Sequence, residues 1–309
     1  MRSLKLVIPA AVLGLALVCA PACKKAPAQA KFATPDEAAT ALLQALKTDN
    51  MEKLRAIFGS DAMQAIASGD QTSDRRDREV IALAMEQSWR WAPRGADRKE
   101  LIIGEEQWPF PVPLMQKGDQ WVFDSAAGKE EVLARRIGRN ELSVIDLCRY
   151  FVEAQNRYAS QPHDGKPAGL FAQKLRSLPG RQDGLYWNVS ESGEPFSPLG
   201  DLVAEAELEG YQEDKLPSAP FWGYHFRILT AQGEAGPGGS KSYIENGEMS
   251  GGFAMLAFPA KYGLSGVATF IVGPNGVVYE KDLGKDTAAQ AAALKEFSPD
   301  PSWAEVRLP

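Results

Sequence analysis

The sequence predicts an α+β protein built from two domains. Helical patterns come first and strand patterns second over residues 32–124, an order typical of this class. An amphipathic helical pattern follows over residues 129–158, and four β-rich runs with no helix between them fill the last third. We therefore expect a helix-plus-curved-sheet domain at residues 32–128, and a helix packed on an antiparallel four-stranded meander at residues 129–309.

The first domain opens with a helix. Thr34-Pro35-Asp36-Glu37 has the form of a capping box with proline at the first helical position, and a leucine stripe follows it. Two further helices are expected over residues 51–58 and 74–87, the first of them capped by Asp49 or Asn50.

Strand patterns complete the first domain. They cover residues 100–103, 108–115 and 121–124, and Gly118-Asp119 forms the turn between the last two. Prolines alternate along the middle run, at positions 109, 111 and 113. Because proline cannot donate to a sheet ladder, this run is expected at an edge or in an irregular extended segment.

The second domain begins with the helix over 129–158, which we expect to bend or restart at Gly138, with Asn140 as the cap of its second part. A loop-rich region follows and is long enough to pack as an excursion of its own. Strands are then expected over residues 224–229, 252–258, 266–272 and 277–279, and a short helix over 286–297 closes the chain. Pro274-Asn275-Gly276 lies between the last two runs and predicts a hairpin.

Residues 1–30 read as a secretory signal peptide. Basic residues precede an apolar run of the usual length for a signal, shorter than a bilayer span. Two processing outcomes are open: cleavage after Ala30, which ends an A-x-A site, or lipidation of Cys23. We therefore expect an exported protein of the periplasm or cell envelope, which contacts the membrane only through a lipid anchor at Cys23.

Charge excludes several partner classes. The chain has 34 Lys+Arg and 40 Asp+Glu, and cleavage after Ala30 leaves 30 basic residues and a net charge of −10. Nucleic-acid binding is not expected, since such proteins carry a basic face.

Two His and three Cys leave little for a metal centre, and we predict no metal and no cofactor. Cys148, the one Cys left after that cleavage, is expected to be a buried thiol.

Six short segments of the chain are shared with a known family. They are Trp108-Pro109-Phe110-Pro111, Arg135-Arg136-Ile137-Gly138-Arg139-Asn140-Glu141-Leu142, Asp183-Gly184-Leu185-Tyr186-Trp187, Ser197-Pro198-Leu199-Gly200, Gly223-Tyr224-His225-Phe226-Arg227-Ile228-Leu229-Thr230 and Gly251-Gly252-Phe253. Over residues 32–303 the chain resembles a secreted bacterial family catalogued as domain of unknown function 2950. The resemblance implies export and no particular reaction.

Each domain also resembles a structural class. Thr34-Pro35-Asp36-Glu37-Ala38-Ala39 and Gly118-Asp119-Gln120-Trp121-Val122-Phe123 are similar to small secreted bacterial domains with a cystatin-like or nuclear-transport-factor-like fold. The helix at 140–158 and the strands after Gly223 resemble the globular headpiece of type IV pilins and pseudopilins. A pilin starts with an apolar membrane helix, whereas Lys129-Glu130-Glu131 occupies that place here.

Catalytic motifs are missing from the sequence. It contains no G-x-S-x-G, Walker or H-E-x-x-H pattern. His163 falls in a segment that reads as an exposed turn. His225 alternates with Tyr224 and Phe226 beside Arg227, so His225 and Arg227 are the candidate polar site. Four tryptophans of the first domain form a candidate apolar pocket or platform: Trp89, Trp91, Trp108 and Trp121.

The leading functional hypothesis is a non-catalytic envelope protein that acts as a binding or assembly module. Its partner would be another envelope protein or a small ligand. Two alternatives stay open: a periplasmic hydrolase of envelope polymer with a cleft near His225, and a small-ligand carrier that uses the tryptophan-rich first domain.

Overall fold

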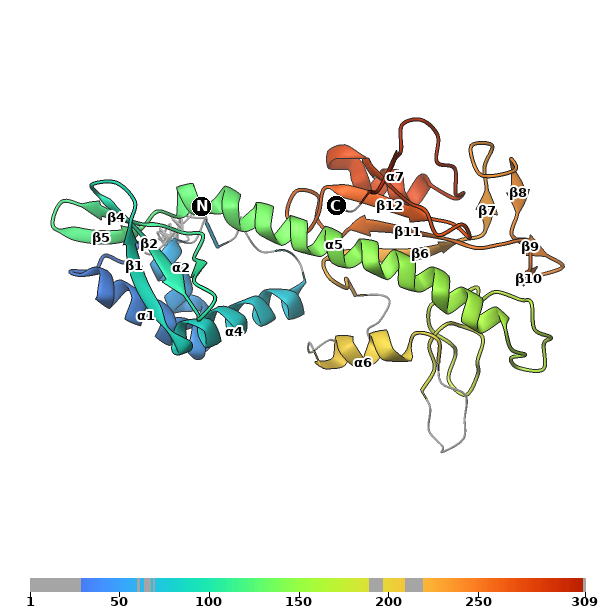
Figure 1. The fold of residues 1–309 in the computed structure, drawn as a ribbon, viewed down its shortest axis with the longest axis horizontal. Coiled ribbons are helices and arrows are strands. Elements are labelled where there is room, and N and C mark those ends of the chain that lie inside the picture. The colour runs from blue at the N-terminus through green and yellow to red at the C-terminus, as the bar shows by residue number, and fades with distance from the viewer. Residues whose placement is uncertain are drawn as a thin grey trace, which may run out of the picture.

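The computed structural model describes residues 29–59, 62–63, 68, 70–188, 197–208 and 219–307, without the side chains of 205–208. Two lobes lie side by side along one long helix, α5 (Ser125–Ala159), as Figure 1 shows. Helices combine with antiparallel sheets in both lobes, which confirms the α+β class. Among the described helices, none has the length and apolar character needed to cross a bilayer.

The helices of the first lobe begin where the sequence provides caps. They are α1 (Pro35–Lys47), α2 (Met51–Phe58) and α4 (Gln71–Gln87). The Thr34 hydroxyl accepts from the Glu37 amide at 3.2 Å, and the Glu37 carboxylate accepts from the Ala33 amide at 3.0 Å, so the capping box is confirmed. Of the two candidate caps of α2, Asn50 is the one used: its side chain accepts from the Lys53 amide at 2.9 Å.

The first-lobe sheet contains β1 (Trp89–Pro93), β2 (Arg98–Ile103), β3 (Trp108–Pro109), β4 (Leu114–Lys117) and β5 (Gln120–Phe123). Its order is β1-β2-β4-β5, and β3 pairs with β2. Of the two expectations for residues 108–115, the structure shows the irregular extended segment and not one continuous strand, because the chain leaves the sheet after Pro109 and returns at Leu114. Pro111 and Pro113 lie in this gap, where no ladder bond is lost.

The core of the first lobe lies between these helices and the sheet. Its buried residues include Leu42 and Leu46 of α1, Leu54 of α2, Met85 of α4, Leu101 and Ile103 of β2, and Leu114 and Phe123. Phe58 and Phe110 stack at 6.3 Å between ring centroids, and Phe58 contacts Phe123 at 5.3 Å. Phe123 of this aromatic cluster ends β5, two residues before α5 begins at Ser125.

Helix α5 runs unbroken for 35 residues, so the restart predicted at Gly138 is wrong. Asp124 caps it by accepting from the Ala127 amide at 3.2 Å. Asn140, predicted as a cap, is buried and donates from its side-chain amide to the Ser265 carbonyl at 2.9 Å. One continuous helix therefore carries residues of both lobes, and Asn140 joins it to the second.

The second-lobe sheet confirms the antiparallel meander and adds a short edge strand. It contains β6 (Tyr224–Leu229), β11 (Ala254–Pro259), β12 (Ala268–Val272), β13 (Val278–Asp282) and β14 (Ala304–Glu305), in the order β14-β13-β12-β11-β6. The C-terminal half of α5 and the short helix α7 (Thr287–Ala293) cover the sheet (Figure 1). Phe151 of α5 meets Phe253 edge to face in the core between them.

Shorter elements surround this sheet. Two small hairpins extend beyond β6: β7 (Ala231–Gln232) with β8 (Lys241–Ser242), and β9 (Ile244–Glu245) with β10 (Glu248–Met249). Helix α6 (Gly200–Leu208) lies in the predicted loop region, where the sequence analysis expected no helix. Residues 160–188 pack against α5, where the Gln155 side chain donates to the Ala172 carbonyl and accepts from its amide, both at 2.9 Å. Phe171 also forms an isolated bridge with Met249 of β10.

Candidate functional site

A large groove lies between α4 and α5 and reaches α6. It has a volume of about 1190 Å³, and residues of both lobes line it. Ordinary small-ligand pockets measure roughly 300–1,000 Å³, so the groove is somewhat larger than such a pocket. We call this feature the interlobe groove.

Polar contacts between α4, α5 and the start of β6 fix the position of the groove walls. Arg136 of α5 faces Asp74 of α4 at 3.2 Å, and Arg139 faces Asp77 at 2.7 Å. Asp70, the cap of α4, accepts from the Gly223 amide of the second lobe at 3.2 Å. The two lobes are thus joined where α4 begins, and the groove opens from this junction toward the first-lobe core.

The groove is mostly apolar at depth. Its apolar lining comes from α1, α2, α4, β2, the segment after β3, α5, α6 and the loop before β6: Leu46, Met51, Phe58, Ile81, Ile103, Phe110, Val132, Leu147, Leu202 and Trp222. Trp108 lies at the rim with 37% of its surface exposed. The Arg135 guanidinium lies 4.8 Å from the centre of the Trp108 ring, a cation–π contact that holds the indole in place.

Buried polar atoms of the groove lining differ in their partners. Ser125 Oγ makes no hydrogen bond within the described chain. Asp74 Oδ1 faces Arg136 Nη2 at 3.2 Å, and Asp74 Oδ2 accepts from the Ser68 amide. The Tyr150 hydroxyl forms a hydrogen bond with the Arg157 side chain. Burial raises the pKa of Tyr150, and the Asp201 carboxylate raises it further. Each unsatisfied polar atom costs free energy, and such atoms are rare in folded proteins.

The charges of the described part of the lining balance. Among the described residues, six basic ones line the groove: Arg76, Arg78, Lys129, Arg135, Arg136 and Arg139. Six acidic ones do so as well: Asp74, Asp77, Glu105, Glu106, Asp146 and Asp201. These described side chains therefore carry no net formal charge.

Comparison with known proteins places the chain in one family. The model of a family described as "protein of unknown function (DUF2950)" matches residues 29–306, nearly the whole chain. The chain belongs to the DUF2950 family. Searches of curated proteins and of solved structures gave no match.

Of the four tryptophans predicted as a pocket in this DUF2950 chain, the groove lining includes Trp108. Trp89, Trp91 and Trp121 are half-buried and pack against the first-lobe core. Lys99 lies 5.8 Å from the centre of the Trp121 ring, and the buried Trp91 Nε1 has no hydrogen-bond partner among the described residues. The structure thus brings three of the four into the core and one into the groove.

The predicted polar pair lies away from the groove, on the second-lobe sheet. His225 packs against Phe258 at 5.5 Å between rings, and the described chain gives it no hydrogen-bond partner. Burial lowers the pKa of His225. Arg227 donates to the Ala291 and Leu294 carbonyls at the end of α7, where a cation stabilises a helix terminus. Among the described residues, no ion pair joins either side chain to a carboxylate.

The exposed position expected for His163 is wrong. This side chain is buried, stacks on Tyr158 at 4.1 Å and lies 5.5 Å from the Trp187 ring. Its Nε2 lies 2.9 Å from the Tyr158 carbonyl oxygen, and its Nδ1 lies 3.2 Å from Gln182 Oε1. Because the aromatic partner Trp187 comes from a distant segment, the local Gln161–Gly165 pattern shows only a turn.

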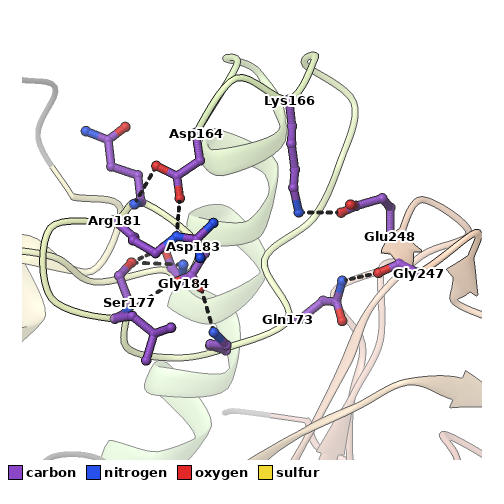
Figure 2. Close-up of polar contacts among 12 residues, drawn as sticks. Asp164, Lys166, Gln173, Ser177, Arg181, Asp183, Gly184, Gly247 and Glu248 are labelled. Carbon is purple, nitrogen blue, oxygen red and sulfur yellow. Dashed lines mark hydrogen bonds and ion pairs between the residues drawn. The ribbon is translucent and has the colours of Figure 1, made fainter.

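A small cavity of about 200 Å³ lies beside His163, and its charged side chains already have partners. Figure 2 shows Lys166 reaching Glu248, at 2.9 Å, and Asp164 between the Arg181 side chain and the neighbouring backbone. Asp183 accepts from the Leu178 amide at 2.9 Å. These contacts hold the 160–188 excursion together, so we interpret the cluster as structural.

The described residues contain no group of three or more His, Cys, Asp or Glu that could hold a metal ion. Cys148 is fully buried in α5, and burial raises the pKa of its thiol to about 12. A thiol of this kind is not a nucleophile near neutral pH. Cys23 lies outside the described residues.

Proposed function

We propose that this DUF2950 protein is an exported protein of the cell envelope that acts as a non-catalytic binding or assembly module, with the interlobe groove as its binding site. Residues 1–30 direct export in this proposal, and a lipid at Cys23 is the alternative to cleavage after Ala30. The observation that carries the binding role is the groove itself. It combines a volume of about 1190 Å³, an apolar floor and walls held by ion pairs between α4 and α5.

The proposal includes a finer assignment of the two lobes. We infer a cystatin-like or nuclear-transport-factor-like first lobe, because three helices pack on one face of a curved antiparallel sheet. We infer a pilin-like second lobe, because a long helix packs on an antiparallel meander. In a pilin the front half of that helix enters the membrane. Here the same half forms a wall of the groove, which favours binding over polymerisation.

A second candidate, the small-ligand carrier, is favoured by the depth of the groove. Leu42 and Leu54 belong to the first-lobe core and also line the groove, so the cavity reaches into that core. A ligand of limited size would bind there, between α1, α2 and α4.

Site-specific photo-crosslinking in the native host tests the proposed binding site. We would place benzoylphenylalanine at Val80 or at Leu83, two exposed positions of α4 with 51% and 60% exposure. Val80 lines the groove, whereas Leu83 is outside its lining. We expect adducts at position 80 that are absent at position 83. Equal adducts at the two positions, or none at either, would count against the groove as the binding site.

A further inference from the structure

We infer that the mature protein keeps Gln29 and Ala30, so that its signal segment is cut off upstream of Gln29 and not after Ala30. This inference rests on the export that belongs to the proposed function, and it decides where the chain is processed. It is argued from the contacts of these two residues, from the wall of the interlobe groove that they support and from the sequence before them.

Gln29 and Ala30 satisfy the carboxyl end of α2. The last four carbonyl groups of a helix have no partner within it, and in α2 they include those of Ala56 and Ile57. The Ala30 amide donates to the Ala56 carbonyl at 2.7 Å, and Gln29 Nε2 donates to the Ile57 carbonyl at 3.0 Å. Both donors lie upstream of the Ala30–Lys31 bond, so a cut at that bond would remove them from this helix end.

The same part of the chain joins α2 to β5, which lies at one end of the first-lobe sheet. Gln29 Nε2 also donates to the Phe123 carbonyl at the end of β5, at 2.7 Å, so both hydrogens of this amide group are used. Phe32 exchanges two backbone hydrogen bonds with Trp121 of the same strand, at 2.9 and 2.8 Å. The chain from Gln29 to Phe32 therefore belongs to the first lobe as one strap, which a cut after Ala30 would divide.

The strap supports a wall of the interlobe groove. Phe58, the last residue of α2, lines the groove, and its ring lies 5.3 Å from that of Phe123. Gln29 links the carbonyl groups of Ile57 and Phe123, which are the chain neighbour and the ring contact of Phe58. Removal of Gln29 would remove this link between the end of α2 and the end of β5. A mature chain that keeps Gln29 therefore also keeps a support of the groove.

The sequence offers processing sites that keep both residues. Ala20-Pro21-Ala22 and Ala26-Pro27-Ala28 have the same A-x-A form as residues 28–30. Cuts after them release 22 or 28 residues, within the roughly 15–30 of a signal peptide. In each case water adds across one peptide bond, which leaves a carboxyl group on the released segment and an amino group on the mature chain. A cut after Ala22 also makes Cys23, the candidate lipidation site, the first residue.

Intact-mass spectrometry of the protein, expressed in full length in its native host, gives the first residue of the mature chain. A processed chain that begins at or before Gln29 supports the inference, whether or not it carries the mass of a lipid. A chain from the envelope that begins at Ala30, at Lys31 or later overturns the inference and leaves the proposed export intact. An unprocessed chain overturns the inference too, and its recovery from the cytosol would overturn the proposed export as well.

Thermal unfolding of the mature protein tests the contacts themselves. Gln29→Ala removes both side-chain hydrogen bonds and is expected to lower the melting temperature by about 2–5 °C. Lys31→Ala changes an exposed neighbouring position, and this matched control is expected to shift the melting temperature by less than about 1 °C. Equal shifts for the two variants would overturn the inference, because Gln29 would then contribute nothing to the fold.

Discussion

Replacing Arg136 by methionine should destabilise the junction that shapes the groove. The Arg136 and Asp74 side chains are 10% and 17% exposed, and they face each other at 3.2 Å. Methionine retains much of the stem but removes the guanidinium, which leaves the mostly buried Asp74 carboxylate without this cation. Losing one partner of a buried pair costs about 3–5 kcal/mol. Asp74 keeps its bond from the Ser68 amide and some exposure, so we expect a loss of about 2–4 kcal/mol.

Arg139→Met is the matched control for this prediction. Arg139 lies one turn further along α5 and pairs with Asp77 of the same helix α4, at 2.7 Å. Its side chain is 54% exposed, and that of Asp77 is 24% exposed. Exposed pairs of this kind contribute about 0–1 kcal/mol, so Arg139→Met should change the free energy of unfolding little.

Urea unfolding followed by tryptophan fluorescence and by circular dichroism gives both free energies. The double variant Arg136→Met/Asp74→Asn should be less destabilised than the two single variants together, by about 1–3 kcal/mol, because neither charge is then left alone. Equal losses for Arg136→Met and Arg139→Met, or additive losses in the double variant, would refute the reasoning that burial makes this pair important.

Two further outcomes follow from the structure. In α5, Gly138→Ala should raise the free energy of unfolding by about 1 kcal/mol, because the added methyl group meets open space. Gly128→Ala should lower the free energy of unfolding by about 1–3 kcal/mol, because the added Cβ would lie 2.6 Å from Val112 Cγ2. Thermal unfolding of the two glycine variants tests these opposite effects. Equal shifts of the two melting temperatures would contradict the reasoning. Stability should also fall at alkaline pH, since burial raises the pKa of Cys148 from 9.0 to about 12 and that of Tyr158 from 10.0 to about 12. A pKa raised in the folded state adds stability that is fully present below the unfolded value and is lost as pH rises toward the folded value. Urea unfolding between pH 8 and pH 12 should therefore show a decline above about pH 9 that Cys148→Ala reduces, and a flat profile would contradict the assignment.

Local chemistry determined the elements that the sequence predicted well. The capping box at Thr34, the Gly118-Asp119 turn and the meander after Gly223 depend on neighbours within a few residues. The predicted break at Gly138 failed because one glycine costs a helix only about 1 kcal/mol, which packing along α5 outweighs.

The groove could not be predicted because its parts are far apart in the sequence. Asp74 of α4 and Ser125 and Tyr150 of α5 line the same groove only because these two helices lie against each other in the fold. Nothing around any of the three distinguishes it from an ordinary helical polar residue. Trp108 was among the four predicted tryptophans, but the sequence held no signal that separated it from the three that pack in the core.

Thiol labelling in intact envelopes tests the central claim, occupancy of the groove, most directly. A single cysteine placed at Val80 or at Leu83 is exposed on α4, and the native Cys148 contributes little background because it is fully buried. We expect both positions to react at similar rates with a maleimide in the purified protein. In the envelope, position 80 should be protected and position 83 should not. Equal labelling of the two positions in the envelope would contradict the account.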